Sequence, residues 1–168
     1  MTQIRWAKRL FIVGIGLFAV LSINTFTFAQ KTPVVYVAPI EGIIDLGVAP
    51  FVQRVLDEAT DAGATAVFLE INTFGGRIDA AVLIRDALLN ARVRTVAFVN
   101  KRAISAGALI ALAAENIVMA DGGTIGAATP VQIGQSGSPA QPVEEKTLSF
   151  VRKEFRATAE SRKRPVPF

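Results

Sequence analysis

The sequence contains no cysteine and no histidine among its 168 residues. Without cysteine there can be no disulfide, no thiolate-bound metal and no cysteine nucleophile. Without histidine there can be no Ser-His-Asp triad and no histidine-ligated zinc. Any activated serine therefore needs another base, and lysine can serve where an apolar setting favours its neutral amine. We expect neither a cofactor nor a metal.

Acidic residues are also missing from the first 40 positions, where Arg5, Lys8 and Arg9 lie. The net charge of +4 therefore misrepresents the body, because beyond residue 29 the chain has 15 basic and 14 acidic residues. A second basic cluster occupies residues 162–164. Neither cluster alternates with aromatic residues, so no nucleic-acid partner is expected.

The first 29 residues have the three parts of a secretory signal peptide. A basic start is followed by a nearly continuous apolar run at residues 10–23, and then by the small residues Thr27 and Ala29. We predict a signal peptide at residues 1–29 that is cleaved after Ala29. The alternative is an uncleaved N-terminal anchor, since a membrane span needs about 20 apolar residues. Either way, the body is expected at the periplasmic or extracytoplasmic face of the membrane.

Apolar periodicity beyond residue 33 alternates between the strand and helix repeats. Segments 41–47 and 72–77 are interpreted as turns, and 128–142, rich in Gly, Ser, Gln and Pro, has the composition of a mobile loop. The alternation predicts an α/β domain with a largely parallel sheet. Strands are expected at residues 34–39, 66–71, 95–99, 117–120 and 124–127, and helices at 49–62, 79–90, 106–114 and 143–161.

Two candidate site features follow consecutive strands, and active sites of parallel α/β sheets gather at the carboxyl ends of strands. The pair Gly75 and Gly76 would let backbone N–H groups approach a ligand closely, although it could also form an ordinary turn. Ser105 precedes an alanine-rich helix, whose free N–H groups favour negative charge. It is a candidate nucleophile, and the alternative is a serine that caps the helix.

Lys146 is the third candidate, because it is the only lysine between Lys101 and Lys153. It lies in the first turn of the last expected helix, directly after the loop. The alternative is a solvated lysine on the helix surface.

Three stretches of the chain resemble the ClpP-class membrane serine proteases of the NfeD group, which are related to signal peptide peptidase A and, more remotely, to ClpP and crotonases. The resemblance extends from about Val34 to Arg164. The stretches are LEINTFGGRIDAA, VNKRAISAGALIALAAENIVMA and GTIGAATPV.

The resemblance implies a fold and a set of catalytic roles. The fold would be a ClpP/crotonase-like stack of ββα units with a largely parallel sheet. The nucleophile would be Ser105, and the general base Lys146, 41 residues later. The oxyanion hole would be formed by the amide of Gly75 or Gly76 and by that of Ala106. Together they would act as a serine endopeptidase with a Ser-Lys dyad.

Family resemblance also implies partners and surroundings. Similar proteases cleave apolar segments of protein or peptide substrates, including the C-terminal region of a stomatin-type membrane protein. Membrane association and a homo-oligomer are expected. Family members normally continue past the last helix, whereas this sequence stops at SRKRPVPF. Residues 30–168 are therefore expected to form a ClpP-like serine protease domain truncated at its C-terminal end.

Two other functions remain open from the sequence. One is an inactive, truncated ClpP-like module that binds an apolar membrane-protein partner. The other is a crotonase-like acyl-CoA enzyme, which also uses paired oxyanion amides. The export signal disfavours the second, because acyl-CoA chemistry is cytoplasmic.

Overall fold

A parallel β-sheet with helices on one side forms the framework of the computed structural model, which describes residues 32–128 and 144–165. Contacts divide the chain into Met1–Thr32 and Pro33–Phe168, and the description below concerns the second unit. The elements are β1 (Val35–Ile44), α2 (Val48–Asp61), β2 (Ala66–Gly76), α3 (Ile78–Leu89), β3 (Thr95–Ile104), α4 (Ala106–Ala113), β4 (Asn116–Met119), β5 (Thr124–Gly126) and α5 (Glu145–Ser161).

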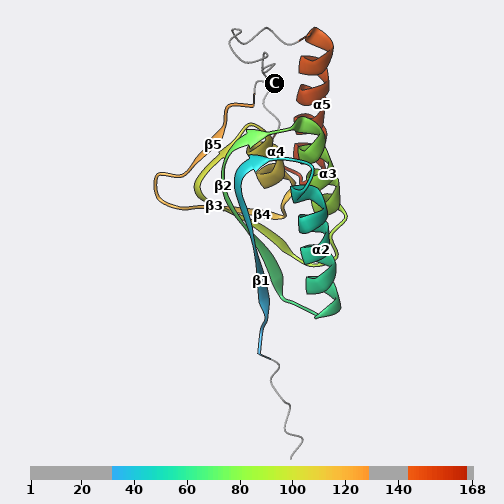
Figure 1. Cartoon of the computed structure of the whole chain (residues 1–168), viewed down its shortest axis with the longest axis vertical. Helices are drawn as coiled ribbons and strands as arrows, with labels where there is room; N and C mark the ends of the chain where they lie inside the picture. Colours follow the sequence, from blue (N-terminus) through green and yellow to red (C-terminus); the bar gives the residue numbers. More distant parts are fainter. Residues whose placement is uncertain (1–31, 129–143, 166–168) are drawn as a thin grey trace, which may run out of the picture. The chain divides into compact units, whose positions relative to one another are not determined.

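Strand order in the sheet is β1-β2-β3-β4, and β5 pairs with the far end of β3. Every pairing is parallel. Figure 1 shows α2, α3 and α5 on the same side of the sheet, as expected when successive right-handed crossovers connect neighbouring strands. The predicted α/β class with a parallel sheet is confirmed.

Alternation along β2 explains where the core lies. Leu69 and Ile71 face the helices and are fully buried, whereas Phe74 on the opposite face is 73% exposed. The same alternation leaves Val37 and Ile43 of β1 exposed. The core therefore lies between the sheet and its helices, and the other face of the sheet keeps apolar side chains at the surface.

Helix α2 ends just before Gly63, within a residue of the end predicted at residue 62. This glycine has a φ of +62°, its N–H donates to the Thr60 carbonyl, and the Ala64 N–H donates to the Ala59 carbonyl. These two bonds are the paired closing bonds of a Schellman motif, which favours glycine at that position.

Two turn predictions were wrong, because the strands are longer than expected. Residues 41–44 continue β1 past a register shift between Glu41 and Ile43, and residues 72–76 continue β2. Gly76 pairs with Ile44, and a Cβ at Gly76 would lie 2.2 Å from the Ile44 carbonyl oxygen. Gly76 therefore permits β1 and β2 to lie close together and does not reverse the chain.

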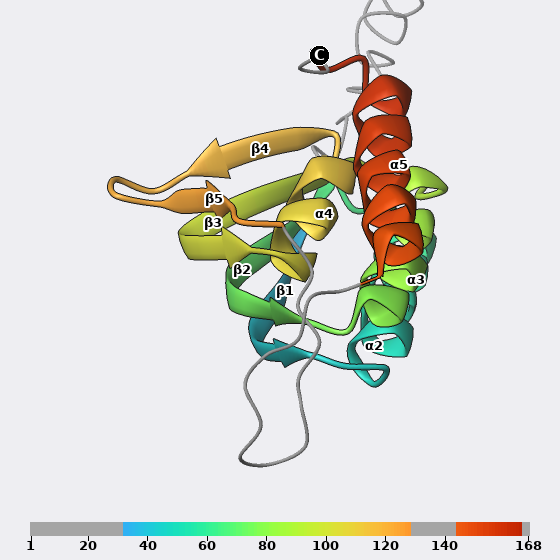
Figure 2. The same ribbon diagram turned by 90° about the horizontal axis from the view of Figure 1, so that it is seen from above.

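Helix α5 packs on α3 and α4, on the side of the sheet that holds the core (Figure 2). Its last turn is attached through Arg85 of α3, whose Nε donates to Thr158 Oγ1 at 2.8 Å. Its end is attached through Arg162, which donates to the Ala113 and Leu88 carbonyls at 2.7 and 2.9 Å. In the described segments, no helix combines the length and the apolar character needed to cross a membrane.

The remaining predictions lie partly outside the described residues. The leader at 1–29 is wholly outside, as are residues 129–143, which include most of the predicted loop and the start of the last predicted helix.

Candidate active site

Ser105 has an unusual backbone conformation, with φ 53° and ψ −116°. Residues other than glycine rarely adopt positive φ, and such strain clusters at functional sites. Neighbouring bonds hold it in place: its N–H donates to the Gly126 carbonyl at 2.8 Å, and its carbonyl accepts from the Ala108 N–H at 2.9 Å. The turn between β3 and α4 thus presents a half-buried serine side chain at the carboxyl edge of the sheet.

The capping interpretation of Ser105 accounts for its position but not for its hydroxyl. Ser105 occupies the N-cap position of α4, yet its hydroxyl makes no capping hydrogen bond within the described part of the chain. N-cap residues normally adopt extended φ and ψ values, which Ser105 does not. The hydroxyl is therefore not committed to stabilising the helix.

Gly75 contacts the serine directly across the strand ends. It has a φ of +107°, and a Cβ at this position would lie 2.8 Å from Ser105 Cβ and 3.2 Å from the Ala106 amide nitrogen. No side chain fits in that space. The structure thus brings together Gly75, Ser105 and Ala106, three of the residues that the sequence indicated.

Ala106 is the first residue of α4 and is almost fully buried. The first four N–H groups of a helix have no partner within the helix, so the Ala106 N–H is available to a ligand. Next to it, Gly107 contacts β2 closely: a Cβ there would lie 2.5 Å from Thr73 Cγ2. Gly107 therefore lets α4 approach the sheet.

Lys146 is exposed in the first turn of α5, and no hydrogen bond joins it to Ser105 in the described residues. Its helix is fixed at the other end, where Arg162 and Arg164 bind the carbonyl end of α4. The structure thus brings the serine and the glycine together without Lys146.

Charged groups flank the site on α3 and β3. Arg77 and Asp79 form a two-bond ion pair at 3.0 and 2.6 Å, and the hydrogen bond from Arg77 lowers the pKa of the Asp79 carboxyl. Arg102 lies over the ring of Phe74, 4.5 Å from its centroid. The described residues contain no cluster of acidic side chains that could hold a metal ion.

Thr73 is a buried polar residue that the sequence analysis did not identify. It is 1% exposed, and its hydroxyl accepts the Gly75 N–H at 2.9 Å. Its position two residues before the glycine pair, on the buried side of a strand otherwise lined by apolar residues, was a signal that could have found it.

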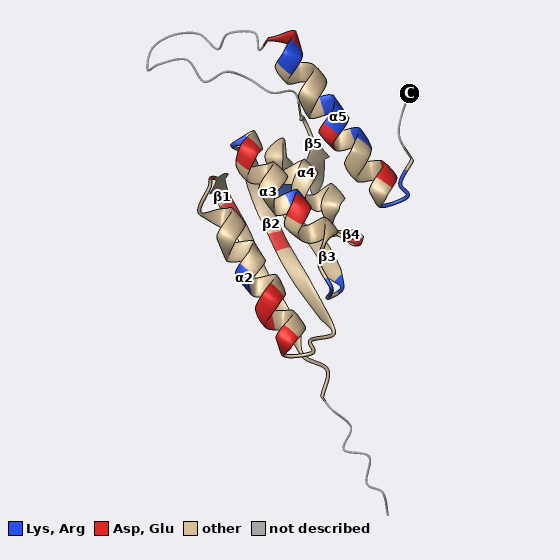
Figure 3. Cartoon of the chain, turned by 90° about the vertical axis from the view of Figure 1, so that its right-hand side faces the viewer, with Lys and Arg blue, Asp and Glu red and all other residues tan. Residues whose placement is uncertain are grey.

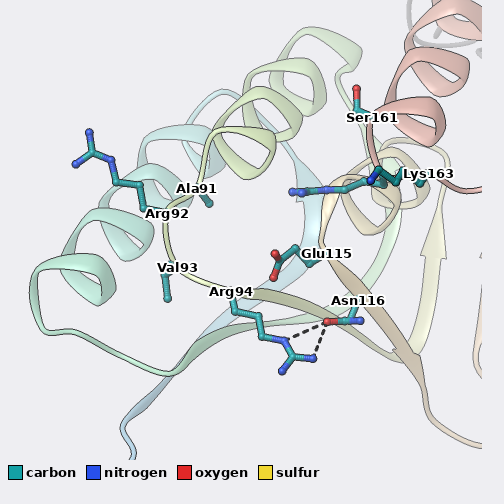
Figure 4. A pocket seen from close by; sticks show the side chains of 9 residues that line it. Ala91, Arg92, Val93, Arg94, Glu115, Asn116, Ser161 and Lys163 are labelled. Atoms are coloured by element: carbon teal, nitrogen blue, oxygen red, sulfur yellow. Dashed lines mark hydrogen bonds between the residues drawn. The ribbon is translucent and has the colours of Figure 1, made fainter.

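The basic pocket in Figure 4 lies at the opposite end of β3 from Ser105. It has a volume of about 640 Å³ and is lined by residues that include Arg92, Arg94 and Lys163. Arg94 donates to Asn116 Oδ1 at 3.2 and 3.0 Å, and this bond joins the starts of β3 and β4. The pocket is separate from the serine.

A parallel sheet with helices packed against it is also the fold of ClpP-like protease domains. ClpP1 from Listeria monocytogenes has this fold, with a TM-score of 0.52 and 20% identity over 74% of this chain and 71% of that chain. More similar are two structures of the 1510-N membrane-bound stomatin-specific protease of Pyrococcus horikoshii.

One of these structures is a serine-to-alanine mutant, with a TM-score of 0.72 and 27% identity over 76% of this chain and 63% of that chain. The other is a lysine-to-alanine mutant in complex with a substrate peptide, with a TM-score of 0.73 and 27% identity over 77% of this chain and 61% of that chain. The predicted ClpP-like fold is confirmed.

The chain belongs to the NfeD1b N-terminal domain family, which it matches over residues 34–168. It is 40% identical over 138 residues to the membrane protein NfeD1b of Bacillus subtilis, covering 82% of this chain and 31% of that protein. It is 33% identical over 122 residues to the membrane-bound protease PH1510 of Pyrococcus horikoshii, covering 70% and 28%. The chain thus spans less than a third of the length of these curated relatives.

Proposed function

We propose that this chain is a serine endopeptidase whose nucleophile is Ser105. The observation that carries the proposal is the contact between Ser105, held at positive φ, and the backbone of Gly75. A merely structural serine does not require this conformation, and strain of this kind is retained where it serves a site.

Acyl transfer to water is the reaction that the arrangement supports. Ser105 Oγ attacks a peptide carbonyl while a neutral amine takes its proton, and the same amine then protonates the leaving nitrogen as the acyl-enzyme forms. Water next attacks the ester carbonyl while the base removes a proton from that water, and the base then returns the proton to Ser105 Oγ as the ester bond breaks. The carbonyl oxygen becomes an anion at both steps and needs donors on one side.

Between the two glycines, the strand geometry favours Gly76 as the oxyanion donor. The Gly75 N–H is already occupied by Thr73 Oγ1, and the Arg77 N–H points towards β1, where it donates to the Ile44 carbonyl. Successive N–H groups of an extended strand point in opposite directions. The Gly76 N–H therefore points away from β1, towards the side of β3, beyond the last β2–β3 pair at Thr73 and Ala103.

The second donor would be the Ala106 N–H, at the start of α4. A Cβ at Gly75 would lie only 3.2 Å from this nitrogen, so the amide lies beside the strand end that carries Gly76. Each donor of this kind contributes about 3 kcal/mol to transition-state stabilisation.

Lys146 is proposed as the base for two reasons. The chain has no histidine, and the spacing from Ser105 to Lys146 equals that of a serine and a lysine in the 1510-N protease. Ser105 and Lys146 are 41 residues apart, and so are the serine and the lysine mutated in the two 1510-N structures. Because Lys146 is exposed here, we propose that bound substrate orders the start of α5 and shields the amine from water. A hydrogen bond between Lys146 and Ser105 is not required in the free protein.

A protein segment of apolar character is the proposed substrate, such as that of a stomatin-type membrane protein. The 1510-N protease is described as stomatin-specific, and one of its structures contains a substrate peptide. Near the site, exposed Phe74 and Ile43 offer apolar surface to such a segment. We further propose that the chain acts at the membrane, outside the cytoplasm.

A second candidate is a non-catalytic module that binds an apolar segment of a membrane protein. The exposed position of Lys146, without a bond to Ser105, is the observation that favours it. The two candidates differ in whether Ser105 reacts.

Labelling of the purified chain by a fluorophosphonate, together with turnover of an apolar peptide, tests the proposal. Wild type should be labelled and should cleave, whereas Ser105→Ala and Ser105→Gly should do neither while remaining folded. Lys146→Arg and Lys146→Ala should each lose activity by about a hundredfold or more, because arginine stays protonated and alanine has no base.

Lys153→Ala, which removes another exposed lysine of α5, is the control and should keep full activity. Turnover by Ser105→Ala would remove Ser105 from the mechanism. An unlabelled wild type that binds the peptide without cleaving it would favour the binding module.

A further inference from the structure

Thr73 contacts β1, the glycine end of β2 and the first turn of α4. It is in β2, two residues before Gly75, and its side chain faces the buried side of the sheet with 1% exposure. A buried hydroxyl needs hydrogen-bond partners, and here the partners are backbone groups of two strands.

The hydroxyl of Thr73 fixes the direction of the backbone at Gly75. It donates to the carbonyl of Gly42, at the irregular point of β1, and accepts the Gly75 N–H at 2.9 Å. Side-chain bonds of this i to i+2 type hold a local backbone conformation in place of a ladder bond. This bond fixes the residue that precedes the Gly76 N–H, which points away from β1 because the next N–H, that of Arg77, donates to the Ile44 carbonyl.

The methyl group of Thr73 contacts the other half of the site. A Cβ at Gly107 would lie 2.5 Å from Thr73 Cγ2, so this methyl lies directly against the first turn of α4. One side chain thus touches the glycine strand end with its hydroxyl, and the helix that begins at Ala106 with its methyl.

We infer that Thr73 is a positioning residue for the oxyanion hole, through its hydroxyl rather than its bulk. The inference rests on the proposed function. Thr73 contacts no reacting atom; it acts by holding Gly75 so that the Gly76 amide faces the carbonyl oxygen attacked by Ser105. Oxyanion donors act on the transition state more than on the bound substrate, so loss of their alignment should lower kcat and leave KM nearly unchanged.

A structural role alone is the competing explanation, and the chain offers a matched control for it. Thr95 is fully buried at the start of β3, and its Oγ1 accepts the Glu115 N–H at 3.0 Å. It is thus a second buried threonine of the same sheet with a backbone partner, at the strand end remote from Ser105. Thr73→Val and Thr95→Val each remove one such hydroxyl and keep the shape.

The test measures kcat, KM and thermal unfolding of the full chain for wild type, Thr73→Val, Thr73→Ser and Thr95→Val, with one apolar peptide. Thr73→Val should lower kcat about tenfold or more, the loss expected when an oxyanion donor is misaligned. KM should change less than about twofold. Thr73→Ser, which keeps the hydroxyl, should stay within about threefold of wild type. Thr95→Val should lose thermal stability like Thr73→Val and keep its kcat.

Three outcomes would overturn the inference. One is a Thr73→Val chain with unchanged kcat; another is a tenfold loss of kcat in both valine variants. If Thr73→Val does not fold, Thr73→Ser decides, and a folded Thr73→Ser chain that has lost its kcat refutes the hydroxyl's role. A wild-type chain that is neither labelled nor active instead refutes the proposed function and this inference with it.

Discussion

At the scale of single residues, the site depends on positions where the backbone leaves no room for a side chain. Gly75 combines a φ of +107° with a space closed by Ser105 and Ile104. Gly122 provides a contrast, because its φ is +74° but nothing lies within 4 Å of an added Cβ. Comparing alanine substitutions at Gly75 and Gly122 therefore separates the cost of a positive φ from the cost of a steric clash.

Gly75→Ala should therefore destabilise the chain by about 3 kcal/mol or more, whereas Gly122→Ala should cost only about 1–2 kcal/mol for its positive φ. Gly75→Ala should also abolish labelling of Ser105, since any relief must move the serine turn. Urea unfolding of both variants, with probe labelling at low urea, measures this. Equal destabilisation by the two changes would mean that the contact between Gly75 and Ser105 is not tight in solution.

Which residues sequence reasoning could find depended on how visibly they stand out in the chain. The closeness of Ser105 to Gly75 was predictable, because each follows an apolar strand and so lies at the carboxyl edge of a parallel sheet. Thr73 was missed because threonine is common in strands, and only the structure reveals that its hydroxyl meets both Gly42 and Gly75. The proposed choice of Gly76 over Gly75 likewise needed the directions of the backbone N–H groups, which composition does not encode.

At the scale of elements, α3 begins beside the site with an ion pair that should respond to acid. Asp79 lies in the first turn of α3, where the hydrogen bond from Arg77 lowers its pKa, as does the Ala80 N–H bond at 2.9 Å. A carboxyl whose pKa is depressed by folding contributes stability above its unfolded value, near 3.9, and loses it as pH falls through the folded value.

Asp79→Asn should therefore lower the melting temperature at neutral pH, and the difference from wild type should shrink as pH falls below about 4. Thermal unfolding between pH 2.5 and 7 gives this difference directly. Arg77→Ala is the control: it removes the cation of the pair and should reduce the difference that Asp79→Asn makes at neutral pH. A difference that persists unchanged at the lowest pH would show that the ion pair is not the cause.

Hydrogen bonds from two arginines attach the end of helix α5 to the rest of the domain. Arg162 and Arg164 lie just after it and bind carbonyls at the ends of α3 and α4, where cations suit the helix dipole. Figure 3 shows basic and acidic residues along α5, in contrast to the mostly uncharged strands. Partial burial lowers the pKa of both guanidinium groups, which nonetheless remain charged at neutral pH.

Removing either arginine should loosen the helix that carries Lys146. Arg162→Ala and Arg164→Ala should each destabilise the chain by about 2 kcal/mol, the scale of hydrogen bonds from a charged donor. Arg156→Ala, exposed on the same helix, should stay within about 0.5 kcal/mol of wild type. Denaturant unfolding provides the comparison, and equal effects from all three variants would contradict the role assigned to the two contacts.

At the scale of the whole molecule, the sequence predicted the order of elements and the parallel sheet, because each strand and helix shows its own spacing of apolar residues. It placed the ends of β1 and β2 too early, since glycine was taken as a sign of a turn. Gly42 and Gly76 instead mark a strand irregularity and a close strand contact. Local composition cannot distinguish these uses of glycine from a turn, because the difference lies in the neighbouring strand.

Export of the whole molecule remains a prediction, made from residues 1–29 of the sequence. Fusion of residues 1–29 to a reporter should carry the reporter across the membrane, with processing after Ala29, because a basic start, an apolar run and small residues before the cut define a cleavable signal. Leu17→Arg, which places a charge inside the apolar run, should block export.

Ala29→Phe should preserve export and prevent processing, since the cleavage site requires a small residue there. Fractionation and the mass of the exported reporter distinguish these results. A wild-type fusion that is exported at full length would replace the cleaved signal with an anchor and keep the domain at the membrane surface. A fusion retained in the cytoplasm would contradict export, and would leave any substrate of Ser105 to be sought inside the cell.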